Sequence, residues 1–207
     1  LNTRTNVGLL DASTLGKIVV KGPDAGQFLD LIYTNIMSTL KVGKCRYGLM
    51  CNENGFLFDD GVVVRVDDNT FICHTTSGGS DKVFAWMEEW VQTEWWDLKV
   101  FILNITEQFC QVTIAGPNAR HVLENVLERP FSSRDLPFMG MLTATFLNTQ
   151  VNIYRISFSG ELSYEVAIPN DNGLNFWKKC MEVGSQFGMQ PYGTEALHVM
   201  RAEKGFI

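Results

Sequence analysis

Residues Gly16–Ile32 read GKIVVKGPDAGQFLDLI, and residues Cys110–Leu127 read CQVTIAGPNARHVLENVL. Each stretch has an apolar run typical of a β-strand, then a Gly-Pro turn, then a segment with helical periodicity. Because proline at a helix start costs no hydrogen bond, we expect Pro23 in the first helical turn. The turns begin at Gly22 and Gly116, which lie 94 positions apart. A shared strand, turn and helix at that interval predicts a duplicated supersecondary unit.

Each half continues with strand-like segments and ends in an amphipathic helix. The first half has strands at 46–51 and 70–75, on either side of a hairpin, and a helix at about 80–93. The second half has strands at 142–147, 151–158 and 162–168, and a helix at about 171–187. We therefore predict the α+β class, with duplicated antiparallel-sheet units, helices on one face, and halves at about 1–94 and 95–207.

The hairpin of the first half, Asn52–Val66, reads NENGFLFDDGVVVRV. Asn-Glu-Asn-Gly is a tight-turn signal, and the aromatic and β-branched residues after it favour a strand. Side chains alternate along a strand, so Asp59 and Asp60 point to opposite faces, and one of them must face inward or into a cleft. A carboxylate that faces inward or into a cleft either accepts a hydrogen bond from a partner or has its pKa raised by desolvation. Either condition is typical of a group that binds a ligand or transfers a proton. The alternative is a hairpin with both acids near solvent.

A second acidic stretch, Arg155–Ala167, reads RISFSGELSYEVA. Its Ser-Gly pair predicts a turn, about which Phe158, Glu161 and Glu165 could gather. A carboxylate can accept two parallel hydrogen bonds from the neighbouring N–H groups of a 2-amino-4-oxopyrimidine, and an aromatic ring offers a stacking face. The alternative is an ordinary hairpin with one cross-strand acid.

Composition narrows the class of protein. A chain of 207 residues with 45% hydrophobic and 19% charged residues is typical of a globular protein with a substantial core. A formal charge of −6 disfavours a nucleic-acid partner. We expect no membrane association and a cytoplasmic location, because the sequence has neither 18 consecutive apolar residues nor the pattern of a signal peptide.

The cysteines, histidines and glycines predict neither a metal site nor a dinucleotide site. The five cysteines include no C-x-x-C pair, and the three histidines are scattered, so we expect reduced thiols and no metal. No G-x-G-x-x-G follows a strand, so this chain should not bind a flavin dinucleotide. The glycine-rich loop at 77–80 is interpreted as a cap of the next helix. The abrupt end, RAEKGFI, suggests part of a longer polypeptide.

Five separated motifs occur in the order and spacing of one family: LDAS at Leu10–Ser13, the GPDA turn, NENGFLFDD, SFSGELSYE and MRAEKG. The chain thereby resembles the glycine-cleavage aminomethyltransferase (T-protein) family over essentially its whole length, without the C-terminal part of the family module. GELSYE and GTEALHVMRAEKG make it most similar to the folate-binding C-terminal region of the sarcosine oxidase α subunit. The folate-binding part of dimethylglycine dehydrogenases is similar too.

This resemblance implies a tetrahydrofolate site with residues placed by motif. Asp60 matches the second aspartate of a G-x-x-x-D-D motif, the catalytic acid. Glu165 matches the pterin-binding glutamate that ends Y-T-G-E-x-x-x-E. Leu15 matches an apolar residue that packs on the pterin, Tyr47 falls near the same ring, and Phe158 takes the place of the tyrosine in Y-T-G-E.

Two departures qualify the match. Phe158 keeps an aromatic face but lacks the tyrosine hydroxyl. The Ala-Arg-Asp of the transferases is replaced by Ala196, Leu197 and His198. Both changes point away from a true glycine-cleavage transferase and suit the sarcosine oxidase branch.

The implied function is capture of the one-carbon unit from oxidised sarcosine as 5,10-methylenetetrahydrofolate. The implied cofactor of this chain is tetrahydrofolate, with FAD, FMN and NAD only in other parts of the parent complex. The implied partners are the other subunits of a hetero-oligomeric oxidase. The site requires that Asp60 and Glu165, one from each half, close on opposite edges of a common pterin-sized hollow.

Four alternatives remain open. One is a glycine-cleavage aminomethyltransferase, and another is the folate domain of a dimethylglycine dehydrogenase. A third is a non-catalytic folate-binding regulatory protein, whose K-G-C-Y-x-G-Q-E motif should follow the last helix, although Phe206 follows Lys204-Gly205 here. The fourth is a subunit-contact module with a decayed folate site, which the presence of both Asp60 and Glu165 disfavours.

Overall fold

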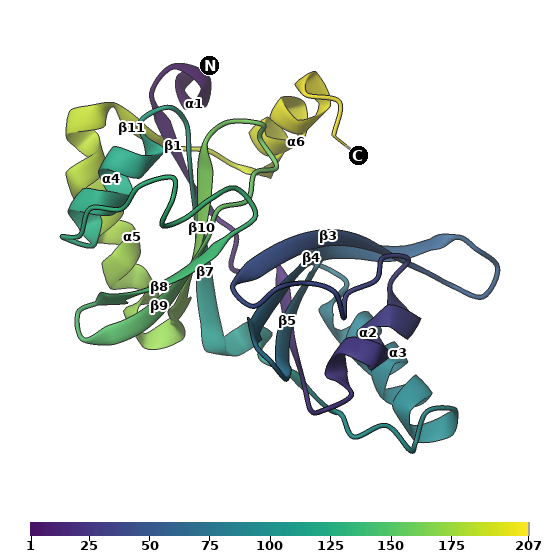
Figure 1. Ribbon diagram of the computed structural model, residues 1–207. Coiled ribbons are helices and arrows are strands. Elements are labelled where there is room, and N and C mark those ends of the chain that lie inside the picture. The colour runs from purple at the N-terminus through teal and green to yellow at the C-terminus, as the bar shows by residue number, and fades with distance from the viewer. Residues whose placement is uncertain (207) are drawn as a thin grey trace. The chain divides into compact units, whose positions relative to one another are not determined.

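The computed structural model describes residues 1–206, and it divides into two compact units (Figure 1). The inserted unit is the continuous segment Thr14–Thr106. The discontinuous unit combines Leu1–Ser13 with the chain from Glu107 onward. No helix within residues 1–206 is long and apolar enough to cross a membrane.

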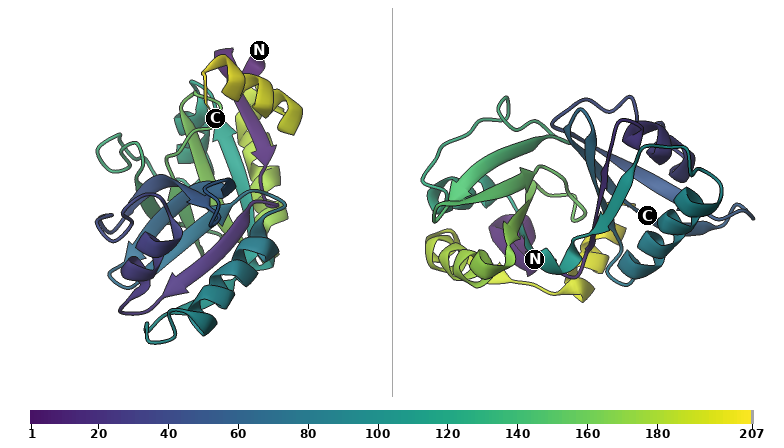
Figure 2. Two further views of the ribbon diagram at one scale, coloured as in Figure 1. Left: turned by 90° about the vertical axis from the view of Figure 1, so that its right-hand side faces the viewer. Right: turned by 90° about the horizontal axis from the view of Figure 1, so that it is seen from below.

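The inserted unit is a five-stranded antiparallel sheet with the strand order β3-β4-β5-β2-β6. Helices α2 and α3 cover one face of this sheet (Figure 2). The strands are β2 (Gly16–Lys21), β3 (Lys44–Cys51), β4 (Leu57–Asp67), β5 (Thr70–Thr75) and β6 (Phe101–Asn104), and the helices are α2 (Ala25–Ile32) and α3 (Ser80–Thr93). The predicted strand at 70–75 and helix at 80–93 are confirmed at both ends.

The discontinuous unit is a six-stranded sheet with the order β11-β1-β7-β10-β9-β8, in which only β1 and β11 pair in parallel. Its strands are β1 (Val7–Asp11), β7 (Phe109–Ala115), β8 (Met141–Phe146), β9 (Thr149–Tyr154), β10 (Ser163–Pro169) and β11 (Met189–Pro191). Its helices are α1 (Asn2–Thr5), α4 (Ala119–Val126), α5 (Asn170–Gly184) and α6 (Thr194–Glu203). The 3₁₀ turns are η1 (Thr106–Gln108) and η2 (Ser185–Phe187).

The predicted fold class is confirmed, because both units run β-α-β-β-β-α along the chain and share the order of four strands, β3-β4-β5-β2 in the inserted unit and β8-β9-β10-β7 in the discontinuous unit. The units divide at 13/14 and 106/107 rather than near residue 94. The difference arises because β1 pairs with β7, and because β6, which follows α3, pairs with β2. Neither strand belongs to the repeated pattern that the sequence displays.

The two Gly-Pro turns have the same backbone form. Gly22 has φ +146° and Gly116 has φ +130°, values that glycine adopts more readily than other residues. A Cβ at Gly22 would lie 2.1 Å from the Lys99 carbonyl oxygen, and one at Gly116 would lie 2.6 Å from that of Asn6. Pro23 lies just before the N-cap Asp24 rather than in the first helical turn, because Gly22 and Pro23 complete the turn.

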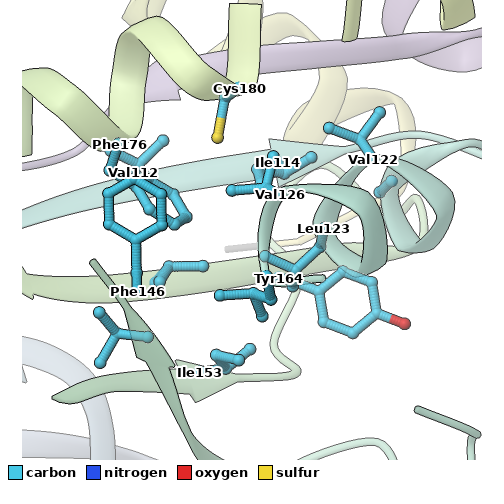
Figure 3. Packing of buried hydrophobic residues seen from close by; sticks show 14 of the residues in the cluster. Val112, Ile114, Val122, Leu123, Val126, Phe146, Ile153, Tyr164, Phe176 and Cys180 are labelled. Atoms are coloured by element: carbon cyan, nitrogen blue, oxygen red, sulfur yellow. The ribbon is translucent and has the colours of Figure 1, made fainter. Parts of the chain in front are cut away.

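Each sheet packs one face against its helices to form a separate core. In the discontinuous unit, Phe146 of β8 and Phe176 of α5 meet edge to face with ring centroids 5.0 Å apart, and Cys180 and Ile153 are fully buried nearby (Figure 3). In the inserted unit, Ile18 and similar residues of the sheet pack against Phe28 of α2 and Met87 of α3. Because side chains alternate, every second strand residue points to the helix-free face.

Asp59 is the acid that faces inward. Its side chain is only 6% exposed, on the same side of β4 as the core residue Val63. One carboxylate oxygen accepts the backbone N–H groups of Asp60 (2.7 Å) and Thr76 (3.0 Å), and the other accepts the Thr76 hydroxyl (2.9 Å). Gly79 leaves room for it, since a Cβ there would lie 1.8 Å from Asp59 Oδ2. Asp59 therefore joins β4 to the turn between β5 and α3.

His74 is a buried histidine on the helix-free face of the inserted unit. Its Nδ1 lies 3.0 Å from the Val62 carbonyl oxygen, which can only accept, so Nδ1 carries a proton. Burial lowers the pKa of His74 to about 4, with a smaller lowering from Lys17, the residue opposite on β2. The folded protein therefore favours the neutral imidazole.

The low pKa of His74 predicts a loss of stability in acid. Between pH 6.5 and pH 4 the unfolded chain binds a proton that the folded chain excludes, so stability that is complete above pH 6.5 falls as the pH is lowered. The loss should reach about 3 kcal/mol, from roughly 2.5 pKa units at 1.36 kcal/mol each. Urea unfolding at pH 7 and pH 4 should show a smaller loss for His74→Asn than for wild type. The exposed control His121→Asn should match wild type, and equal losses in all three would contradict the role of His74.

Removing the Asp59 carboxylate should destabilise the inserted unit. Asp59→Ala leaves two buried N–H groups and a hydroxyl without their acceptor, which should lower the free energy of unfolding by about 2–4 kcal/mol. Asp59→Asn keeps the oxygen that accepts both N–H groups and should lose less. Urea denaturation measures both, with Asp68→Ala in the exposed β4–β5 turn as the control. An Asp59→Ala variant as stable as Asp68→Ala would refute the joining role.

Candidate functional site

Tyr47 and Asp60 lie together on the helix-free face of the inserted unit. In the register of β3 and β4, Tyr47 is opposite Val62 and Leu49 is opposite Asp60, so all four side chains share one face. The Tyr47 hydroxyl donates to Asp60 Oδ2 over 2.7 Å. The structure thus brings together two of the residues that the sequence assigns to one site.

The environment of this pair is partly shielded from water. Burial, followed by the hydrogen bond to Asp60 and its negative charge, raises the pKa of Tyr47 to about 12. Tyr47 therefore remains a hydrogen-bond donor at neutral pH, although its side chain is 40% exposed. The contact orients the Asp60 carboxylate while the pair stays open to a ligand.

Glu165 lies on the face of the discontinuous unit's sheet that is opposite α4 and α5. Its strand neighbours Tyr164 and Val166 belong to the core beneath α4 and α5, so Glu165 points the other way. The side-chain amide of Gln111, on β7, donates to Glu165 Oε2. Each unit therefore presents one oriented carboxylate on the face opposite its core helices.

The other residues expected at the site occupy different positions. Leu15 is half-buried just before β2, and its carbonyl oxygen accepts the buried Lys17 ammonium over 2.7 Å. Phe158 is 38% exposed in the loop between β9 and β10. Glu161 of that loop turns to Arg4 and forms an ion pair at 2.8 Å, so it does not join Glu165.

Two further residues beside Glu165 were not anticipated from the sequence. Gln111 is fully buried, and the hydroxyl of Tyr192, just after β11, is buried too. Burial raises the pKa of Tyr192, and the negative charge of Glu165 raises it further. The available signals were a glutamine in the apolar strand CQVTIA and a tyrosine after a short strand, both of which are weak.

The chemistry of these side chains favours recognition and proton transfer over metal binding. Asp60 is a carboxylate that can exchange a proton with a ligand, and Glu165 can accept hydrogen bonds from ring N–H groups. Within residues 1–206, no three or more histidine, cysteine, aspartate or glutamate side chains gather as a metal site. A common hollow for Asp60 and Glu165 stays a prediction.

Sequence comparison finds relatives named sarcosine oxidase subunit alpha and aminomethyltransferase. The chain is 48% identical over 206 residues to the sarcosine oxidase subunit alpha of Corynebacterium sp. (strain P-1), covering 99% of this chain and 21% of that subunit. It is 41% identical to the corresponding subunit of Rhizobium meliloti (strain 1021), covering 100% and 21%. The aminomethyltransferase of Natranaerobius thermophilus is 31% identical, covering 98% and 54%. The chain thus spans about a fifth of the length of the sarcosine oxidase subunits.

Structural comparison and the family model agree with these relatives. The glycine cleavage system aminomethyltransferase T from Bartonella henselae matches with a TM-score of 0.86 and 25% identity, covering 100% of this chain and 53% of that one. The heterotetrameric sarcosine oxidase of Corynebacterium sp. U-96 matches with a TM-score of 0.63 at 14% identity, covering 89% of both chains, which supports the fold alone. The model described as the GCVT N-terminal domain matches residues 1–207. The chain belongs to the GCVT N-terminal domain family.

Proposed function

We propose that this chain is the tetrahydrofolate-binding module of a sarcosine oxidase alpha subunit, and that it captures the one-carbon unit of oxidised sarcosine as 5,10-methylenetetrahydrofolate. The observation that carries the proposal is the Tyr47–Asp60 pair, a partly exposed carboxylate that is held in place by a hydrogen bond of 2.7 Å. The 48% identity to a sarcosine oxidase alpha subunit supports the choice of parent enzyme.

Asp60 acts as the proton-handling group in this proposal. Tetrahydrofolate, when bound, would supply the nitrogens N5 and N10 that take up the carbon of the imine or iminium made from sarcosine. Asp60 would accept the proton that N5 loses and balance the positive charge that develops there. The same proton would pass to the glycine nitrogen as its bond to the carbon breaks, so that glycine leaves as the amine, and N10 would bond to the carbon and lose its proton to water, which closes the 5,10-methylene bridge. The hydrogen bond from Tyr47 keeps the carboxylate in one orientation, so that much of the rate enhancement comes from positioning.

Glu165 anchors the ligand in the same proposal. Its carboxylate accepts hydrogen bonds from the 2-amino group and the adjacent ring N–H of the pterin. Leu15 packs on the ring, and Phe158 offers an exposed aromatic face to the ligand. The chain alone is then a binding module whose chemistry depends on the oxidase that supplies the one-carbon unit.

Substitution of Asp60 should impair methylene capture, whereas substitution of Glu165 should impair tetrahydrofolate binding. Asp60→Asn should leave the affinity for tetrahydrofolate within a few-fold of wild type but reduce methylene capture by about 100-fold or more, because the general base is lost. Glu165→Ala should weaken tetrahydrofolate binding by about 10- to 100-fold, because charge-assisted hydrogen bonds are lost. Calorimetry with tetrahydrofolate measures binding, and the fraction of sarcosine methyl carbon recovered as 5,10-methylenetetrahydrofolate rather than formaldehyde measures capture in the parent oxidase.

Matched controls are available in the chain. Asp67→Asn, at the far end of β4, and Glu182→Ala, with a side chain 70% exposed, should leave both measurements unchanged. Equal affinity of Glu165→Ala and wild type would discard the anchor role. Absence of tetrahydrofolate binding by wild type would discard the proposed function.

A glycine-cleavage aminomethyltransferase is the second candidate, favoured by the TM-score of 0.86 to the Bartonella henselae protein. Leu197 and His198 stand where such a transferase has arginine and aspartate, which disfavours it. Release of ammonia from an aminomethylated lipoyl protein in the presence of tetrahydrofolate would reverse this preference.

A further inference from the structure

Three buried polar side-chain atoms of the discontinuous unit have no hydrogen-bond partner within the described residues. One is Nε of Arg201 on α6, and the other two are the side-chain oxygen Oε1 of Gln111, on a residue with 0% exposure, and the hydroxyl of Tyr192. Buried polar atoms in proteins are nearly always paired, and an exception in a native structure calls for an explanation. The Gln111 amide contacts Glu165, and the negative charge of Glu165 acts on the Tyr192 hydroxyl, so a ligand bound at Glu165 can supply the missing partners of these two atoms.

The orientation of the Gln111 amide follows from Glu165. The amide N–H donates to Glu165 Oε2, and a reversed amide would place two oxygens against each other. Oε1 is therefore the atom left to accept a hydrogen bond. In the register of β7 and β10, Gln111 is opposite Ala167 and Thr113 is opposite Glu165, so Gln111 and Glu165 project from one face of the sheet.

The side chain of Tyr192 lies on the same face of the sheet as Glu165 and Gln111, and it comes from the segment that follows β11. Its backbone N–H donates to the Leu9 carbonyl oxygen, which fixes the segment beside β1. The ring lies over Gly8, where a Cβ would be only 2.7 Å from Tyr192 Cδ1. Gly8 alternates with the core residues Val7 and Leu9, so the tyrosine lies on the face opposite α4 and α5, where the Thr3 hydroxyl of α1 also approaches the same Cβ position, at 2.5 Å. The raised pKa of Tyr192, to which Glu165 contributes, agrees with a hydroxyl that remains protonated beside this carboxylate.

We propose that Gln111 and Tyr192 are ligand-binding residues that, with Glu165, recognise the hydrogen-bonding edge of a 2-amino-4-oxo ring. Glu165 and Gln111 Oε1 accept from the exocyclic amino group and the ring N–H, and the Tyr192 hydroxyl donates to the ring carbonyl oxygen. The inference rests on the proposed function and adds the residues that determine ring specificity. Because both atoms are shielded from water, a ring that lacks one of these groups leaves a buried atom unpaired and is rejected.

Calorimetry of the chain with tetrahydrofolate and with its 2-desamino analogue tests this specificity. Wild type should bind tetrahydrofolate about 100-fold more tightly than the analogue, since a site built for a hydrogen-bonding group discriminates strongly against its loss. Gln111→Met, of similar length but without the amide, should reduce this ratio to about 10-fold or less. Gln150→Met, at an exposed position on β9, is the matched control and should keep the wild-type ratio.

A double-mutant cycle separates direct contact from an effect through Glu165. If Gln111 touches the ligand, Gln111→Met should weaken binding further in the Glu165→Ala background, by about threefold or more. If Gln111 only holds Glu165, the second substitution should have no effect there, which would overturn its assignment as a ligand-binding residue.

Tyr192→Phe keeps the ring and removes only the unpaired hydroxyl. It should weaken tetrahydrofolate and the analogue equally, by about 10-fold, because both carry the ring carbonyl oxygen. The unfolding midpoint in urea without ligand should stay the same or rise, since no hydrogen bond is lost. A lower midpoint with unchanged affinity would show a structural role and overturn the Tyr192 assignment. Should Gln111→Met fail to fold, Tyr192→Phe still decides whether the unpaired atoms serve a ligand.

The outcomes distinguish this inference from the proposed function. If wild type does not bind tetrahydrofolate, the proposed function fails first. If wild type binds it, Glu165→Ala weakens binding, and Gln111→Met and Tyr192→Phe behave like Gln150→Met, then the function stands and the specificity residues are wrong.

Discussion

The alternation of side chains along a strand, combined with a core that packs one face of each sheet against two helices, is the constraint on which this structure depends. It assigns Asp59 to the core side of β4 and Asp60 to the helix-free side, although the two residues are adjacent. The same rule sends Tyr164 and Val166 into the core and Glu165 away from it. A shift of one residue in either register would reverse the roles of the neighbouring side chains.

The buried carboxylate of Asp59 and the partly buried carboxylate of Asp60 are stable in their positions because each accepts a hydrogen bond from a specific donor. Asp59 accepts three hydrogen bonds and ties a turn to a strand, whereas Asp60 accepts one from Tyr47 and remains partly exposed. The difference separates an acid that is used for stability from one that is available to a ligand. Surface pairs such as Lys179–Glu182 carry no such constraint and contribute little.

Much of the fold could be predicted from the sequence because it repeats local signals. The Gly-Pro turns, the strand Thr70–Thr75 and the helix Ser80–Thr93 all follow from nearby residues. The discontinuous unit could not be predicted in this way, because β1 pairs with a strand about a hundred positions later. Local periodicity carries no information on such a pairing, so the repeated pattern predicts halves that meet near residue 94, whereas the compact units divide after Ser13 and Thr106.

The residues of the candidate site, like the strand pairings, could be predicted from the sequence only where a local signal marks them. The sequence indicated the acids, since carboxylates inside apolar strands stand out, and family motifs gave them roles. It gave no comparable signal for Gln111 or Tyr192, whose interest lies in a buried oxygen and a buried hydroxyl without partners. Phe158, which replaces a tyrosine of the family motif, is 38% exposed and can contribute only its ring. In the proposed site a tyrosine hydroxyl is instead provided by a residue 34 positions later, Tyr192, whose ring lies where a side chain at position 8 would be. In this proposal the hydroxyl that is missing at Phe158 is thus replaced by that of Tyr192, a residue that only the tertiary structure brings to the site.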